Sequence, residues 1–168
     1  ELEAFDPENS IWHNCRGISA YHLAELYLLT GRKDAAAELL GLAISDFTTL
    51  VAIDPGDFRI VEKLALAERL MALFILDDSI DRALELSSRA QSRVEDILSQ
   101  DAVKARTVLT AGIVAEAHGR VLLEAGDEAA ARSTFNQALE LLTSQNQSGL
   151  AEVAVERQII SHLNGRDA

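Results

Sequence analysis

Small residues recur at matched positions three times along this 168-residue chain, at intervals of 47 and then 48 residues. In each copy a turn residue is followed, 5 and 12 positions later, by an alanine. Periods of this order are typical of stacked helical pairs, in which neighbouring copies share one core. We therefore expect a repeat protein that supplies a surface rather than a reaction. The recurring positions are Gly31, Ala36 and Ala43, then Asp78, Ala83 and Ala90, then Gly126, Ala131 and Ala138.

The residues between these turns have the spacing of amphipathic helices. Ala20, Leu23, Ala24 and Tyr27 follow the i, i+3, i+4, i+7 pattern that places side chains on one helix face. Glycine favours a helix end at 31, and the sequence 54–56, Asp-Pro-Gly, is a strong break. The whole chain, 1–168, is expected to form one domain with helix pairs at about 11–54, 57–100 and 102–143, and with a capping helix at about 149–164.

The third copy carries Gly119 on its first helix, Gly126 at the turn, and Ala131, Phe135 and Ala138 on its second helix. With this pattern the copies resemble tetratricopeptide repeats. The resemblance implies an all-α, right-handed α-solenoid of three antiparallel helix pairs plus the C-terminal cap. The second copy departs from the family pattern at the small, turn and aromatic positions. The first copy matches with Leu23, Ala24, Tyr27, Gly31, Ala36, Leu40 and Ala43, and the second offers Leu70, Met71, Phe74, Asp78, Ala83, Ser87 and Ala90.

The repeat period differs from that of the family, whose unit is about 34 residues long. The surplus is roughly seven residues per helix, which is nearly two turns at 3.6 residues per turn. Two added turns keep the same face inward. We therefore expect unusually long helices of about 20 residues, or roughly 30 Å.

Charge and cysteine content limit the classes of partner and compartment. The chain has 15 basic and 27 acidic residues, a net charge of −12 that repels a nucleic-acid backbone. A single cysteine, Cys15, excludes an internal disulfide and favours the reducing cytoplasm. No uninterrupted apolar run of about 18 residues predicts a membrane span. Because the sequence starts at Glu1 rather than methionine, we expect either a processed chain or a domain excised from a larger protein.

The resemblance also implies a concave groove, lined by outward positions of the first helix of each pair. Transferred by register, these positions are mainly acidic, which favours a basic or amphipathic polypeptide partner. The lysine and asparagine pattern of family members that bind chaperone tails is absent. An ordinary solvated helix face remains the competing interpretation, because exposed glutamate and arginine stabilise helices in any case. The groove residues are Tyr21, His22 and Glu25, then Glu68 and Arg69, then Glu116 and Arg120.

No residue pattern predicts catalysis, a metal site or a cofactor. Trp12, His13 and Cys15 form the only cluster with reactive groups, and a zinc site needs three or four ligands. We therefore expect no enzyme but a protein-interaction scaffold or regulatory module. Two alternatives stay open: a small-ligand sensing domain with a pocket between long helices, and an assembly domain that forms a homodimer.

Overall fold

The computed structural model describes residues 9–100 and 105–146, and these residues form an all-α array. Six helices are present in the described part of the chain, and most are close to the expected length of about 20 residues. The expected capping helix at 149–164 lies outside the described residues. The helices are α1 (Ser10–Leu29), α2 (Lys33–Ile53), α3 (Phe58–Phe74), α4 (Ile80–Leu98), α5 (Ala105–Glu124) and α6 (Glu128–Asn146).

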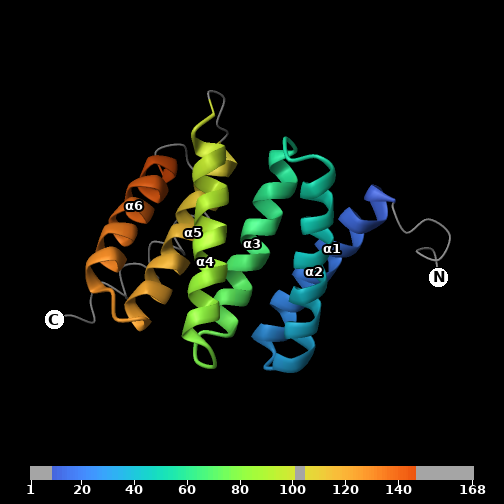
Figure 1. The fold of residues 1–168 in the computed structure, drawn as a ribbon, viewed down its shortest axis with the longest axis horizontal. Helices are drawn as coiled ribbons and strands as arrows, with labels where there is room; N and C mark the ends of the chain where they lie inside the picture. The colour runs from blue at the N-terminus through green and yellow to red at the C-terminus, as the bar shows by residue number, and fades with distance from the viewer. Residues whose placement is uncertain (1–8, 101–104, 147–168) are drawn as a thin grey trace.

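Consecutive helices pack side by side as antiparallel pairs, so the array follows the order of the sequence (Figure 1). Each helix packs most closely on its neighbours in the chain, and α3 additionally contacts α5. The backbones of α1 and α3 come close at few positions, and these two helices meet through their side chains. The first helix pair is therefore joined to the rest of the array by the packing of α2 on α3 and by side chains of α1 that contact α3.

The turns inside the helix pairs depend on glycine in two of the three copies. Gly31 and Gly126 adopt φ values of 76° and 85°, a left-handed conformation that only glycine takes without strain. The second copy has Asp78 at the equivalent position, and no non-glycine residue in the described chain has a positive φ. There α3 ends at Phe74, two residues earlier in the repeat register than α1 and α5. The loss of the turn glycine thus shortens one helix.

The repeated alanines lie in the core, as the repeat pattern predicts. Ala36, Ala43, Ala83 and Ala90 are completely buried, and their counterparts in α6 are nearly so. The helical periodicity also predicts inward positions at Leu23, Ile80 and Leu139, but Leu23 is 38% exposed, Ile80 is 43% exposed and Leu139 is 39% exposed. Ile80 is the first residue of its helix, and Leu139 belongs to α6, which is covered mainly by α5 among the described helices.

Glycines also let paired helices approach at positions where a large side chain faces them. A Cβ added at Gly17 would lie 2.8 Å from the Phe47 ring, and one at Gly112 would lie 2.7 Å from Leu142. These two contacts occupy equivalent positions of the first and third copies. At the same two positions the second copy has Leu64 and Val94, both fully buried. In the first and third copies, a large side chain on the second helix fills the space beside a glycine of the first helix. In the second copy, both helices contribute an aliphatic side chain at these positions.

Gly119, the small position of the third copy, gives a test of this close packing. A Cβ there would lie 2.7 Å from the Phe135 ring. We expect Gly119→Ala to lower the free energy of unfolding by roughly 1 kcal/mol, because an overpacking cost of about 2 kcal/mol exceeds the gain in helix propensity of about 1 kcal/mol. Gly41→Ala is the matched control, since nothing lies within 4 Å of the added Cβ. Urea unfolding should show stabilisation for Gly41→Ala, and stabilisation by Gly119→Ala would contradict the packing argument.

Candidate functional site

The predicted groove residues all lie on α1, α3 and α5, the first helices of the three pairs. On α1, His22 is exposed and its Nδ1 lies 3.0 Å from the Glu25 carboxylate. Tyr21 is half-buried beside them, and its hydroxyl interacts with Glu25 and Arg69. Burial raises the pKa of the Tyr21 phenol, and the nearby Glu25 carboxylate adds to this effect. Tyr21 therefore stays neutral and joins α1 to α3.

Glu68 and Glu116 are not the outward-facing carboxylates that the register predicted. Each is only 1% exposed, and the two positions are exactly one repeat apart. The side chain of Arg93 donates to Glu68 over 2.8 Å, and Arg89 lies 3.2 Å from the same carboxylate. Arg120 lies 3.7 Å from Glu116. Both carboxylates are thus neutralised inside the array, because a buried charge is costly unless it is paired.

A pocket lies between α1 and α3, and it includes two of the predicted groove residues. Its volume is about 210 Å³. Ile18, Phe47 and Leu66 supply its apolar wall. The polar lining is Tyr21 and His22 from α1, Lys63 from α3 and Arg106 from α5. Sequence reasoning missed Lys63 and Arg106, because the helical register does not show that α5 reaches the space beside α1.

Lys63 and Arg106 are the two cations that line this pocket. Lys63 donates to the amide oxygen of Asn14 over 2.8 Å. Among the described residues, no carboxylate lies within ion-pair distance of Lys63 or Arg106. Burial lowers the pKa of Lys63; Asp57 opposes this effect, whereas Arg106 adds to it. The pocket is therefore apolar inside and positive at its edge.

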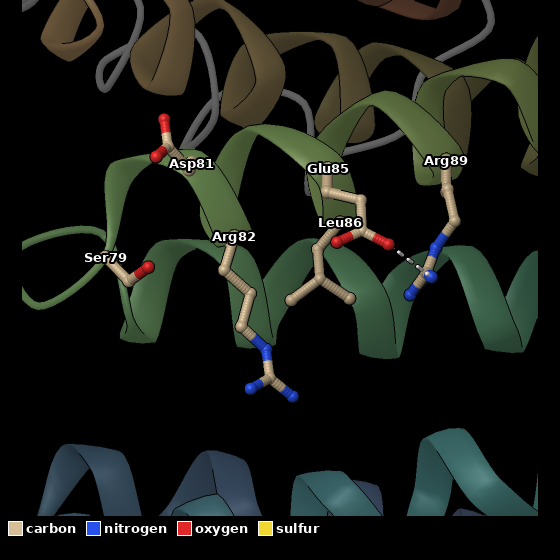
Figure 2. A pocket seen from close by; sticks show the side chains of 6 residues that line it. All are labelled: Ser79, Asp81, Arg82, Glu85, Leu86 and Arg89. Carbon is tan, nitrogen blue, oxygen red and sulfur yellow. Dashed lines mark hydrogen bonds and ion pairs between the residues drawn. The ribbon is translucent and has the colours of Figure 1, made fainter.

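A second hollow, of about 430 Å³, lies along α4 and is shown in Figure 2. Its lining has two acidic residues, Asp81 and Glu85, and two basic residues, Arg82 and Arg89. Arg89 lies 3.2 Å from Glu85 and also pairs with buried Glu68, whereas Arg82 points away from Asp81 in Figure 2. Because its charges are equal in number along one helix and one pair is formed at i, i+4 spacing, the hollow has the character of a solvated helix face.

The residues around Trp12 have a structural role that the sequence left open. The Nε atom of Arg16 donates to Asp46 over 2.7 Å, and Nδ1 of His13 donates to the same carboxylate over 2.7 Å. Burial of Asp46 opposes its ionisation, but the hydrogen bonds from Arg16 and His13 outweigh burial and lower the pKa of this carboxyl. Cys15 is exposed. No group of potential metal ligands is found among the described residues.

A serine and a histidine also meet between α4 and α5. Ser87 Oγ lies 2.9 Å from Nδ1 of His118. Burial lowers the pKa of His118, and Glu95 opposes this effect. Ser87 is itself buried, so this pair is placed in a helix interface rather than in a cleft that admits a substrate. We interpret it as a buried polar contact that is satisfied within the core.

Comparisons with protein-family profiles, curated proteins and solved structures give no match to this chain. One helix, α2, is long and apolar enough to cross a membrane by composition alone. In the structure α2 packs between α1 and α3 and carries Asp46, which is paired with Arg16. Because a core helix passes the same test of composition, the cytoplasmic location stays a prediction.

The Asp46 contact gives a prediction with a defined pH dependence. We expect Asp46→Asn to lower the free energy of unfolding by about 2–3 kcal/mol near neutral pH, less than for a fully buried pair because Arg16 is partly exposed. The pKa of Asp46 is lowered in the folded protein, so its contribution is complete above the unfolded-state pKa and is lost as pH falls through the lowered value.

Urea unfolding of wild type and variant at several pH values tests this. The difference between the two proteins should be constant from neutral pH down to the ordinary range of aspartate and should shrink below it. Asp96→Asn, an exposed aspartate on α4, is the matched control and should change stability by less than about 0.5 kcal/mol. A difference that persists unchanged in strong acid would assign the loss to packing instead of charge.

Proposed function

We propose that this chain is a non-catalytic protein-interaction or regulatory module whose binding face is formed by α1, α3 and α5. The observation that carries the proposal is the pocket of about 210 Å³ on that face, where the apolar side chains of Ile18, Phe47 and Leu66 lie beside the cations Lys63 and Arg106. Preformed pockets with an apolar wall and a few converging polar groups are the usual form of binding sites.

The helix contacts support a tetratricopeptide-like, right-handed solenoid as the architecture of this module. In such an array each pair packs on the next, and the first helices of successive pairs line one face. The contact of α3 with α5 agrees with this arrangement, as do the buried alanines at repeat intervals. A C-terminal cap at 149–164 remains part of the proposal.

The proposed partner is an amphipathic polypeptide segment. The internal pairing of Glu68 and Glu116 removes two of the three carboxylates that favoured a basic partner, and the third, Glu25, is paired with His22. The face also carries the apolar wall of the pocket together with Lys63 and Arg106. An apolar anchor residue on the partner would fill the pocket, and its polar side would remain in water.

Peptides selected from a random displayed library on the wild-type chain test the proposed face. Leu66→Trp fills the pocket, and we expect it to weaken binding at least about tenfold, because an anchor pocket supplies much of the binding energy. Leu139→Trp, at an exposed position of α6, is the matched control and should leave the affinity unchanged. Calorimetry gives the affinities, and thermal melting followed by circular dichroism checks that both variants fold.

A second variant, His22→Trp, places an indole ring at an exposed residue of the pocket lining. It tests the same pocket if Leu66→Trp does not fold. Peptides that bind both pocket variants as well as wild type would place the binding surface elsewhere.

One observation favours a second candidate function, self-assembly through α1. Leu26 is 52% exposed and Leu29 is 86% exposed. Leu26 occupies the same repeat position as Val121, which is fully buried and packs against α4 residues. Leu26 therefore occupies a position that, in the third copy, packs against the preceding helix pair. In α1 no described helix covers this position.

Light scattering during size-exclusion chromatography tests this second candidate. If α1 pairs with a second copy, the wild-type chain should elute as a dimer, and replacing Leu26 and Leu29 with lysine should give a monomer, because charge is not tolerated in an apolar interface. Leu123→Lys, at an exposed leucine of α5, should not change the mass. A wild-type monomer would exclude assembly through α1.

A further inference from the structure

The pocket between α1 and α3 has a size that restricts what can enter it. At about 210 Å³ it exceeds the 150 Å³ of an apolar cavity that binds benzene, and it is smaller than the 300–1,000 Å³ of sites for drug-sized ligands. A single ring or a branched aliphatic group with a short arm therefore fits. Ile18, Phe47 and Leu66 give such a group an apolar surface to contact.

The edge of the pocket restricts the charge of the occupant. Lys63 is half-buried and bonded to the neutral amide of Asn14, and Arg106 lines the same space from α5. The other polar groups of the pocket already have partners nearby, since His22 pairs with Glu25 and Tyr21 interacts with Glu25 and Arg69. Asp57, the carboxylate that acts on Lys63, is paired with Arg59 at 3.2 Å. Because no carboxylate of residues 9–100 or 105–146 lies within ion-pair distance of Lys63 or Arg106, a negatively charged occupant would complement both cations.

We propose that this pocket binds a compact apolar carboxylate, in which one ring or branched chain contacts Ile18, Phe47 and Leu66 while the carboxylate meets Lys63 and Arg106. The carboxylate accepts hydrogen bonds from the lysine ammonium and from the arginine guanidinium, whose planar fork suits two carboxylate oxygens. The same chemistry occurs in a free small acid and in an acidic residue beside an aromatic one. The inference rests on the proposed function only in placing the binding site on the same face.

The probe is 3-phenylpropanoate, and its neutral analogue of the same shape is 3-phenylpropan-1-ol. Titration of the full chain followed by amide NMR shifts measures both affinities and shows where each probe binds. We expect the acid to bind at least about tenfold more tightly than the alcohol, because charged hydrogen bonds are the stronger ones. The largest shifts should fall on α1 and α3 around Tyr21 and Leu66. Equal affinities, or shifts centred elsewhere, would overturn the proposal.

Lys63→Met removes the charge but keeps the length of the side chain, so the apolar wall is retained. It should weaken the acid about tenfold and leave the alcohol unchanged. Arg106→Gln should act in the same direction. Lys33→Met and Arg132→Gln, at exposed positions on α2 and α6, are the matched controls and should bind both probes as wild type does. An undiminished affinity of Lys63→Met and Arg106→Gln for the acid would overturn the assigned contacts.

The capped dipeptide acetyl-Phe-Asp-amide distinguishes the two sources of this chemistry. Tighter binding of the dipeptide than of phenylpropanoate assigns the pocket to a polypeptide partner, and the reverse order assigns it to a free acid. The outcome also separates the two proposals. If library peptides bind the face but neither carboxylate probe enters the pocket, this inference fails and the interaction module stands. If a probe binds and no peptide does, the carboxylate site stands and the interaction module fails.

Discussion

The close approach of antiparallel helices across small side chains is the constraint on which the rest of this structure depends. Where Gly17 meets Phe47 and Gly119 meets Phe135, one helix has no side chain so that the ring of the other can reach its backbone. The alanines at repeat intervals do the same over the length of each pair. Because dispersion forces require contact, removing this space would push the helices apart and expose the leucines around them.

Buried carboxylates add a second set of contacts that holds the helix pairs in register. Asp46 joins α2 to α1 through Arg16, and Glu68 joins α3 to α4 through Arg89 and Arg93. Glu62 accepts a hydrogen bond from Thr107 and so joins α3 to α5. Each carboxylate is costly to bury alone and therefore demands its partner. On the face formed by α1, α3 and α5, Glu68 and Glu116 are thus paired inside the array, whereas Glu25 stays exposed beside His22.

The helices and their small-residue core could be predicted from the sequence, because periodicity and turn glycines are local signals. The repeat register also brought Tyr21 and His22 to the pocket. The register wrongly placed Glu68 and Glu116 on an exposed face, because it shows which residues share a helix face but not whether a neighbouring helix covers that face. Glu68 is covered by Arg89 and Arg93 of α4, which lie 21 and 25 residues away in the sequence. Lys63 and Arg106 were missed for a related reason: they lie on α3 and α5, and their place beside Tyr21 and His22 depends on how three helices pack together, which the periodicity of a single helix does not show.

The contacts between α1 and α3 beside the pocket have a mechanical consequence. One wall of the pocket belongs to the first helix pair and the other to α3 and α5, and the contacts of Lys63 with Asn14 and of Tyr21 with Arg69 join α1 to α3. An occupant that touches both walls would add its binding free energy to these contacts and would therefore oppose the separation of α1 from α3.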